Sequence, residues 1–422
     1  MAELALANPS THLARLTGLR AVAAGWVVID HVRLSAEQWV PGAEYVRPLT
    51  YSGYLGVDLF FALSGFILCH RYLAEMGPRL DRHRIASFFA LRFARLYPVH
   101  LFMILVVALY AVALHVRRGD SLDRSDLGWR SLTENLLLVH AWWNQPASWN
   151  GPSWSISLEW LAYLFFPFIV MLVWRIGSRG RSQGGIALFV VGYLPLVLQS
   201  TGILELKSPG LGLGPGLYLL RILGGFVGGC AVFLLARAWD AQGHTANRRF
   251  VAVALASTWM LLVAVVFWFA RDSGQVTTAL TVEDYTDFPR ELWAATPLLA
   301  VIVGLTSLPT NRVGVLGSRY MVIGGLFSYS LYMTHAFVLE FFGAWYGGGG
   351  WLAGKVGISE LPWYGTTIYL GLVLGIAFLV AYFVWKFVEE PSRRALRRRL
   401  VPSANPLPVE EREANGRRKR WV

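Results

Sequence analysis

The chain is poor in charge and in cysteine for its length. Only 15% of its 422 residues are charged and 55% are hydrophobic, with a mean hydropathy of +0.46, whereas ordinary globular domains are about 25% charged. This composition excludes an ordinary soluble domain and indicates a membrane protein with many spans. The two cysteines, Cys69 and Cys230, lie in apolar segments. They imply neither a disulfide framework nor a thiolate metal site, and we expect no bound metal.

Two further features are missing. The first apolar run has no small-residue cleavage site at its end, so we expect a retained helix instead of a signal peptide. No internal repeat is evident, which argues against an inverted-repeat transporter. The net charge of +12 would suggest nucleic acid in a soluble protein. In a membrane protein it fits a cytoplasmic excess of positive residues and contact with anionic lipid, so we expect membrane lipids and no nucleic acid as partners.

Ten apolar segments come close to the roughly 20 residues that a membrane helix needs. They are residues 14–33, 52–73, 92–115, 153–174, 185–200, 216–236, 250–270, 291–308, 320–342 and 364–388. If the N-terminus is cytoplasmic and the spans alternate, Lys and Arg divide 27 to 10 in favour of the inside segments. This split predicts an all-α polytopic membrane protein with about ten transmembrane helices and both termini in the cytoplasm.

The last part of the chain changes character. From Glu389 the sequence EEPSRRALRRRL leads into a polar tail that ends in RRKRWV. We expect a short amphipathic helix at the inner membrane surface, followed by a basic cytoplasmic tail. The domain boundaries that follow are a membrane domain over residues 13–396 and a tail over residues 397–422.

The segment Leu13–Val32 carries charge at one end and an ionisable ring at the other. Arg15 and Arg20 lie near its inner end and His31 near its outer end. At a rise of ~1.5 Å per residue, Arg15 and His31 are roughly 24 Å apart, most of the thickness of a hydrocarbon core. Ionisable groups in a membrane helix are costly to insert, so this pair indicates function.

The alternation of spans gives five ionisable residues from five different spans a similar depth in the outer half: His31, Asp58, Glu159, Arg221 and His335. Proton transfer suits such a cluster, because imidazole titrates near neutral pH and a carboxylate on its other nitrogen fixes the tautomer. Either an acyl-transfer base or the proton relay of a transporter would have this form.

Several of these residues have a structural alternative. Glu159 or Asp58 suits the carboxylate role better than Asp30, which points about 100° away from His31 on a helix. Asp58 is equally suited to hold the glycine-rich turn that follows it or to pair with Arg221. His335 is equally suited to bridge two helices by a hydrogen bond. The aromatic loop after His140 either lines an acceptor groove or forms an interfacial belt.

The inner half has a basic site. In FFALRFARLYP, Arg92 and Arg95 are three residues apart and share one helix face. Arginine side chains bind phosphate through two parallel hydrogen bonds, whereas the arginines of the preceding loop fit simple anchoring at the inner surface. A molecule with a phosphate head and a long reactive arm would link this site to the outer histidines.

The segments that carry these residues resemble motifs of the acyltransferase-3 family of integral membrane acyltransferases. The matching segments, in the family's order, are RLTGLRAVAAGWVVIDH, GVDLFFALSGFIL, RFARLYP, PSWSISLEWLAYLFFP, FSYSLYMTHAF and FVEEPSRR. The resemblance spans about residues 13–396. Two positions depart from the usual pattern: Asp30, before the histidine, to which we assign no role, and the sequence that follows Glu159.

The resemblance implies transfer of an acyl group, usually acetyl, from cytoplasmic acetyl-CoA or another acyl-CoA to a hydroxyl of a carbohydrate or lipid-linked glycan. No cofactor is implied as permanently bound, and the implied location is the inner (cytoplasmic) membrane of a bacterial-type cell. His31 matches the catalytic histidine and Glu159 the carboxylate of the fourth span. Arg15 and Arg20 match the two arginines of the family's opening motif, and Arg92 and Arg95 match its donor-engaging arginine pair. We expect all four to bind the acyl-CoA. Further site candidates are Asp58, Ser155, Arg221, Tyr332 and His335.

Three functions remain open from the sequence. The favoured one is an acyl-CoA-dependent O-acyltransferase with His31 as general base or as transient acyl carrier. The second is a proton-coupled transporter or flippase in which His31, Glu159 and His335 relay protons. The third is a non-catalytic sensor or scaffold. Only the first requires the inner arginine pair.

Overall fold

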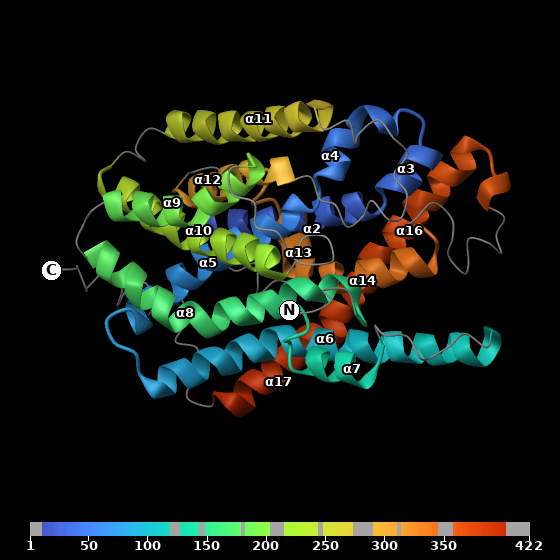
Figure 1. Ribbon diagram of the computed structural model, residues 1–422, viewed down its shortest axis with the longest axis horizontal. Helices are drawn as coiled ribbons and strands as arrows, with labels where there is room; N and C mark the ends of the chain where they lie inside the picture. The colour runs from blue at the N-terminus through green and yellow to red at the C-terminus, as the bar shows by residue number, and fades with distance from the viewer. Residues whose placement is uncertain are drawn as a thin grey trace.

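The structure is a computed structural model that describes residues 11–118, 127–142, 148–178, 182–202, 215–243, 248–272, 290–309, 314–344 and 358–401. Over these ranges the chain forms helices joined by turns, with no β-strand. The all-α fold expected from the sequence is therefore confirmed. Most of the longer helices run along the long axis of the molecule (Figure 1). The end of the basic tail, from residue 402 on, lies outside the described residues.

The first half of the chain supplies helices of very different length. They are α2 (Thr11–His31), α3 (Arg33–Trp39), the 3-10 turn η1 (Ala43–Val46), α4 (Arg47–Tyr51), α5 (Leu55–Met76), α6 (Arg82–Arg118), α7 (Trp129–Leu136), the 3-10 turn η2 (Gly151–Ser153) and α8 (Trp154–Ser178).

The second half begins with three long helices and ends in a nearly continuous helical segment. Its elements are α9 (Ser182–Ser200), α10 (Pro215–Ala241), α11 (Arg248–Asp272), the 3-10 turn η5 (Arg290–Ala295), α12 (Thr296–Ser307), α13 (Arg319–Leu326), α14 (Ser328–Phe341), the 3-10 turn η6 (Ile358–Glu360), α16 (Trp363–Val384), the π-helical turn η7 (Trp385–Glu389) and α17 (Glu390–Leu400).

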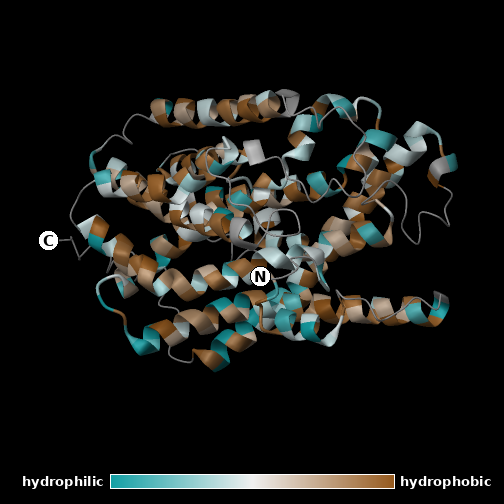
Figure 2. Ribbon diagram, viewed as in Figure 1, coloured by the Kyte–Doolittle hydropathy of each residue, from teal (hydrophilic) through white to brown (hydrophobic). Residues whose placement is uncertain are grey.

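The helices have the length and hydropathy of membrane spans. Among the described residues, seven helical segments are long and apolar enough to cross a membrane, or eight if the bent pair α13–α14 is one span. Apolar residues dominate the middle of long helices such as α8 and α11, and polar residues gather at helix ends and in the lower centre, around α6 and α7 (Figure 2). The ten predicted spans all fall on helical segments, but 14–33 on α2 and 291–308 on the short α12 are not among these seven. The number of crossings and the cytoplasmic termini stay predictions.

One predicted span is broken. The run 320–342 forms two helices, α13 and α14, which meet at 67°. Gly324 and Gly325 precede the break and are poor helix formers, and the Ser328 hydroxyl donates to the Gly325 carbonyl at 2.9 Å. A Cβ on Gly325 would lie 1.9 Å from the Thr17 carbonyl oxygen of α2. The glycine therefore lets α13 pack closely on α2.

The centre of the bundle is the contact between α5 and α10. A Cβ on Gly65 would lie 2.0 Å from the Phe226 carbonyl oxygen, and one on Gly229 would lie 2.1 Å from that of Ala62. Small residues allow such close backbone approach between membrane helices. α5 also packs against α2, α8 and α12, so its side chains face the interior on several sides.

The last described helix returns to the bundle. η7 has π-helical geometry, which is frequent at functional sites. It joins α16 to α17, and α17 packs along the arginine-bearing helix α6 (Figure 1). The short helix expected after Glu389 is thus present. It lies against the bundle beside Arg92 and Arg95 of α6.

Candidate active site

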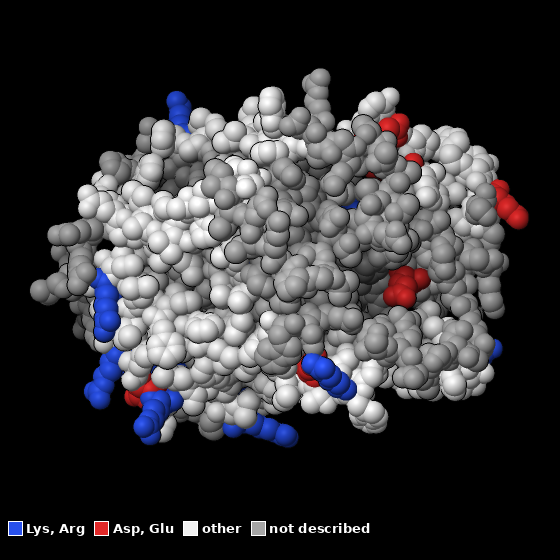
Figure 3. All heavy atoms as spheres, in the orientation of Figure 1, with Lys and Arg blue, Asp and Glu red and all other residues white. Residues whose placement is uncertain are grey.

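A cavity of about 600 Å³ opens between α2, α5, α6, α8, α14 and α17. Its lining is graded from exposed to buried. Arg71, Arg394 and Arg397 are exposed and form its mouth, whereas Ser155 and Tyr332 are buried and form its inner end. Space-filling atoms of Lys and Arg gather toward the left and lower left of the molecule, over the region of α17 and the start of α6 (Figure 3).

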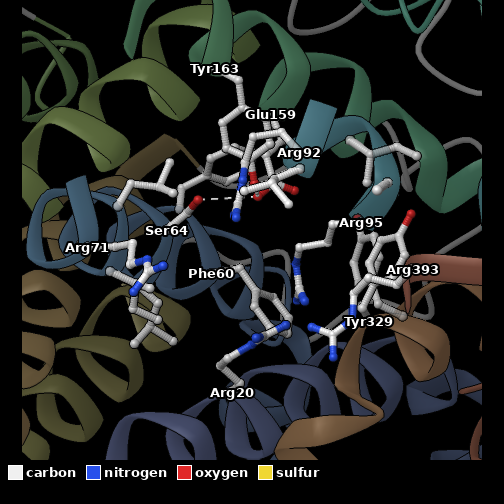
Figure 4. A pocket seen from close by; sticks show the side chains of 18 of the residues that line it. Arg20, Phe60, Ser64, Arg71, Arg92, Arg95, Glu159, Tyr163, Tyr329 and Arg393 are labelled. Carbon is white, nitrogen blue, oxygen red and sulfur yellow. Dashed lines mark hydrogen bonds between the residues drawn. The ribbon is translucent and has the colours of Figure 1, made fainter. Parts of the chain in front are cut away.

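Three arginines from two helices converge inside the cavity. Arg20 comes from α2, and Arg92 and Arg95 come from α6. In Figure 4 the guanidinium groups of Arg20, Arg95 and Arg393 point toward the same space beside Tyr329. The structure therefore brings together the Arg92–Arg95 pair and one of the two opening arginines.

Arg92 has an environment that favours its charge and leaves one donor open. Its guanidinium lies 5.8 Å from the ring centre of Tyr72 and 5.9 Å from those of Phe88 and Tyr163, within the range of cation–π attraction. One terminal nitrogen is 3.5 Å from the Tyr72 hydroxyl. The buried Nε has no hydrogen-bond partner among the described residues, and buried N–H groups normally have one.

The other opening arginine lies apart from the cavity. Arg15 is buried, and it donates to the Leu308 carbonyl oxygen at 3.4 Å. It is not among the residues that line the cavity. Of the two arginines that match the family's opening motif, only Arg20 is placed to touch a ligand there.

Glu159 also lines the cavity, and it does not form the expected hydrogen bond with His31. Its carboxylate accepts hydrogen bonds from the Ser64 hydroxyl at 3.2 Å (Figure 4) and from the Tyr163 hydroxyl. The predicted depths of Glu159 and His31 are similar, but depth does not fix the direction in which a side chain points. On α8 the Glu159 side chain points toward the arginines of the cavity. The carboxylate therefore belongs with the arginines and not with the histidine.

His31 instead lies against the other predicted histidine. The ring centres of His31 and His335 are 4.8 Å apart with an interplanar angle of 79°. Nδ1 of His31 is 2.8 Å from the Val27 carbonyl oxygen, and Nδ1 of His335 is 3.1 Å from that of Leu331. A carbonyl oxygen only accepts hydrogen bonds, so each Nδ1 carries the hydrogen. In each neutral ring the basic lone pair is then on Nε2.

Tyr332 connects the cavity to the histidine pair. Its ring centre is 5.9 Å from that of His335 and 6.1 Å from that of Phe60, which lines the cavity. The Ser155 and Tyr332 hydroxyls are hydrogen-bonded at 2.8 Å. Both residues were site candidates, and they form the buried end of the cavity next to His335.

Asp58 and Arg221 form a buried ion pair. Arg221 donates through Nε and one terminal nitrogen to the two carboxylate oxygens of Asp58, at 2.8 and 2.6 Å, and also to the Tyr54 carbonyl at 3.1 Å. The alternative in which Asp58 pairs with Arg221 is confirmed. Neither residue lines the cavity, so the pair holds α5 to α10.

Asp30, which had no assigned role, also has a partner. Its carboxylate accepts a hydrogen bond from Arg33 at 2.5 Å, and both side chains are buried. The Arg33 guanidinium stacks over the Tyr51 ring at 4.5 Å. The pair lies directly beside His31 in the sequence and fixes the junction between α2 and α3.

His140 belongs to a buried structural cluster. Its Nε2 is 3.2 Å from the Ser153 hydroxyl, and its ring lies parallel to that of His100 at 6.0 Å. Burial and the neighbouring His100 lower the pKa of His140 to about 3, so the ring is neutral. Part of the aromatic loop after it, residues 143–147, lies outside the described residues.

Several cavity residues were not expected from the sequence. Ser64 and Tyr163 hold Glu159, and Tyr329 donates to the Leu96 carbonyl at 2.6 Å. More unexpected is α17, which lines the cavity with Glu390, Arg393, Arg394 and Arg397. These four positions follow the spacing i, i+3, i+4, i+7 of one helix face, a signal that the sequence did contain.

The chemistry of the lining suits an anionic ligand with a long neutral part. Seven arginines and two glutamates line the cavity, beside apolar and hydroxyl-bearing side chains. The described residues contain no group of three or more His, Cys, Asp or Glu placed to hold a metal ion. The cavity therefore offers arginine forks at one end and the hydroxyl groups of Ser155 and Tyr332 at the other. His31 and His335 do not line it, and His335 lies against the Tyr332 ring.

Comparison with known proteins agrees with this class of site. A family model described as "Acyltransferase domain" matches residues 13–382, so the chain belongs to the acyltransferase-3 family. It is 28% identical over 416 residues to "Acyltransferase MdmB" of Streptomyces mycarofaciens, which covers 94% of this chain and 96% of that protein. No solved structure matches the chain.

Two other relatives cover different parts. "Protein 2 in picA locus" of Rhizobium radiobacter is 32% identical over 204 residues, which is 46% of this chain and 97% of that protein. A Staphylococcus aureus (strain COL) protein with an O-acetyltransferase name is 23% identical over 398 residues, 90% of this chain and 57% of that protein. The fold and the family together define a membrane acyltransferase.

Proposed function

We propose that this protein is an acyl-CoA-dependent O-acyltransferase that moves an acetyl group to a hydroxyl of a carbohydrate or lipid-linked glycan. The observation that carries the proposal is the series of side-chain contacts that leads from the arginine-lined cavity, through the Tyr332 ring, to the paired rings of His31 and His335. One end of this series suits phosphate and the other suits proton transfer. An acyl-CoA has phosphates and a reactive thioester at the two ends of a long arm.

The cavity has the size and charge for the donor. Its volume of about 600 Å³ lies within the ~300–1,000 Å³ of ordinary ligand sites. Arg20, Arg92 and Arg95 would bind donor phosphates through charge-assisted hydrogen bonds. The apolar residues and the hydroxyls of Ser155 and Tyr332 would guide the pantetheine arm toward the histidines. The predicted topology places the cavity mouth at the cytoplasmic side, where acyl-CoA is made.

The chemistry follows from the tautomer of His31. In the direct route, Nε2 takes the proton from the acceptor hydroxyl as its oxygen attacks the thioester carbonyl carbon. The carbon–sulfur bond breaks, and His31 returns the proton to the departing thiolate. The products are an O-acetyl ester and free CoA. In the relay route, Nε2 first attacks the thioester carbonyl carbon, the carbon–sulfur bond breaks and the CoA thiolate leaves. The acceptor oxygen then attacks the acetyl carbon, the bond from that carbon to Nε2 breaks, and the hydroxyl proton passes to the thiolate. Both routes start from the same lone pair on Nε2.

Glu159 has a different role in this proposal from the one expected. It lies in the arginine cavity and bonds to Ser64 and Tyr163, so it would act as a positioning residue for Arg92 and Tyr163. The Val27 carbonyl orients the His31 ring, because it accepts the hydrogen bond from Nδ1. The His335 ring packs nearly perpendicular to the His31 ring and limits its rotation.

The acceptor class rests on the relatives' names and on the membrane setting. Two of the relatives that match most of the chain carry the names acyltransferase and O-acetyltransferase. These names support transfer to a hydroxyl, and the outer position predicted for His31 supports an acceptor at the cell surface. The proposed location is the inner membrane of a bacterial-type cell.

The test measures acetyl transfer in cells and in purified membranes. Mass spectrometry of cell-surface glycans should show acetyl esters in cells with the wild-type protein and not in cells with His31→Ala. Membranes supplied with radiolabelled acetyl-CoA should transfer label to the same material. A His115→Ala variant, altered at an exposed histidine of α6, should behave as wild type. Flux of a substrate into vesicles without acetyl-CoA, together with unlabelled glycans, would overturn the proposal in favour of a transporter.

A further inference from the structure

The arginines of the cavity form two groups at different depths. Arg20, Arg92 and Arg95 are half-buried on α2 and α6. Arg71 at the end of α5 and Arg394 and Arg397 of α17 are exposed at the mouth. A ligand with one anionic group would occupy only one of these levels. Two levels of arginine indicate a ligand with two separated anionic groups.

α17 presents its arginines to the cavity along one face. Glu390, Arg393, Arg394 and Arg397 all line the cavity, and on a helix with about 100° per residue they fall within a sector of about 100°. Arg399 belongs to the same helix, is exposed and does not line the cavity; it points about 200° away from Arg397. The basic run is therefore divided into a cavity face and an outer face. A simple membrane anchor would need no such division.

The mouth arginines are held weakly and can change partner. Glu390 accepts hydrogen bonds from Arg393 at 2.5 Å and from Arg394 at 2.6 Å, and the side chains of both arginines are more than 40% exposed. Ion pairs as exposed as these contribute little to stability. Arg71 and Arg397 form no ion pair with a described residue. Among the described carboxylates, a phosphate at the mouth would compete with Glu390 for these arginines.

We infer that Arg71, Arg394 and Arg397 form a second phosphate subsite that binds the ribose phosphate of the CoA donor. This inference rests on the proposed function. CoA carries a pyrophosphate next to its pantetheine arm and a separate phosphate on its ribose. The inner arginines bind the pyrophosphate, so that the arm reaches Tyr332, and the outer arginines bind the ribose phosphate at the mouth. α17 is thus part of the donor site.

The experiment compares the binding of CoA and 3′-dephospho-CoA to the full-length protein in phosphatidylcholine nanodiscs by calorimetry. Binding needs no acceptor, so the unknown acceptor does not limit the measurement. Wild type should bind CoA about 10-fold to 100-fold more tightly than dephospho-CoA, since the difference is one set of charged hydrogen bonds. In the double variant R394Q/R397Q this ratio should fall to near one, through weaker binding of CoA and unchanged binding of dephospho-CoA.

The matched control is R399Q, which removes the same charge from the outer face of the same helix and should keep the wild-type ratio. Surface substitutions of this kind change stability little, so both proteins should fold. E390Q should tighten CoA several-fold and leave dephospho-CoA unchanged, because it removes the competing carboxylate. A further series uses nanodiscs with phosphatidylglycerol; if a lipid headgroup occupies the mouth, the ratio will collapse there.

The outcomes separate the inference from the function on which it rests. If wild type binds CoA and dephospho-CoA equally well, or if R394Q/R397Q keeps the wild-type preference for CoA, the second subsite is overturned. CoA would then still be the donor. If the preference of wild type for CoA over dephospho-CoA is lost in nanodiscs with phosphatidylglycerol, a lipid headgroup occupies the mouth, and the inference is overturned as well. No binding of CoA at all overturns both the inference and the proposed function.

Discussion

The arginine cavity and the histidine pair use ionisable side chains in opposite ways. The cavity is open at one end, and its arginines come from α2, α5, α6 and α17. The histidines are packed ring against ring, each with Nδ1 on a carbonyl one turn earlier in its own helix. One region keeps its donors available for a ligand. The other fixes the orientation of its groups.

This difference indicates a division of work. Binding a large, highly charged donor needs several mobile arginines that can close on phosphates. Proton transfer needs a single base in one tautomer at a fixed place. Tyr332 lies between the two regions, because it lines the cavity and its ring also contacts that of His335. Substitutions in the two regions should therefore change different kinetic quantities.

The largest expected effect is at the histidine pair. Replacing His31 by alanine removes the general base, so kcat for acetyl transfer should fall by about 10²- to 10⁴-fold, while affinity for CoA stays at the wild-type value. The rate with saturating acetyl-CoA checks this, with His115→Ala as control. A His31→Ala protein that transfers acetyl at the wild-type rate would remove the histidine from the mechanism.

A third pair of charges shows what a purely structural ionic contact does. Asp58→Asn breaks the buried pair with Arg221 and leaves the arginine without a counter-charge, which should cost about 3–5 kcal/mol of stability. The thermal midpoint in detergent should drop well below that of Glu75→Gln, a variant at an exposed site of the same helix. The rate per folded molecule should be close to wild type. A stable protein without activity would instead place Asp58 in the chemistry.

At the arginine cavity the expected effect is on donor affinity. Arg95→Gln removes one charged donor to phosphate, so the KM for acetyl-CoA should rise about 10-fold to 100-fold with little change in kcat. Arg175→Gln, at an exposed position of α8 outside the cavity, should leave KM unchanged. A fall in kcat with constant KM would contradict the division between binding and chemistry.

The smallest expected effect lies at the junction. Tyr332→Phe keeps the ring that packs on His335 and removes only the hydrogen bond with Ser155. The transfer rate should fall about 2-fold to 10-fold, as for one neutral hydrogen bond, and CoA affinity should not change. Tyr320→Phe, at an exposed site of α13, is the control. A loss as large as that of His31→Ala would give the tyrosine hydroxyl a direct part in the reaction.

Much of the fold and part of the site could be predicted from the sequence. Hydropathy located the helices because membrane spans need long apolar runs. Helical spacing put Arg92 and Arg95 on one face, and the alternation of spans put His31 and His335 at one depth. These inferences depend on periodicity and length, which are properties of single helices. They say little about the direction in which each helix faces.

The rest depends on that direction. Glu159 has about the depth of His31, yet α8 turns it toward the arginines. The break between α13 and α14 was missed because the run is apolar on both sides, although its two glycines mark it. The arginines of α17 were predicted to lie on an amphipathic helix at the inner membrane surface, because a basic run usually faces solvent or lipid. Their helix folds back on α6 only through the π-helical turn at Trp385–Glu389.

The most direct test of the division of work is the affinity for CoA of His31→Ala and Arg95→Gln, measured side by side in nanodiscs with acetyl transfer on the same preparations. The account predicts that His31→Ala binds CoA as wild type does and transfers no acetyl. It predicts that Arg95→Gln binds CoA at least about 10-fold more weakly and transfers acetyl normally once the donor is saturating. Weak CoA binding by His31→Ala, or wild-type CoA binding by Arg95→Gln, would contradict it.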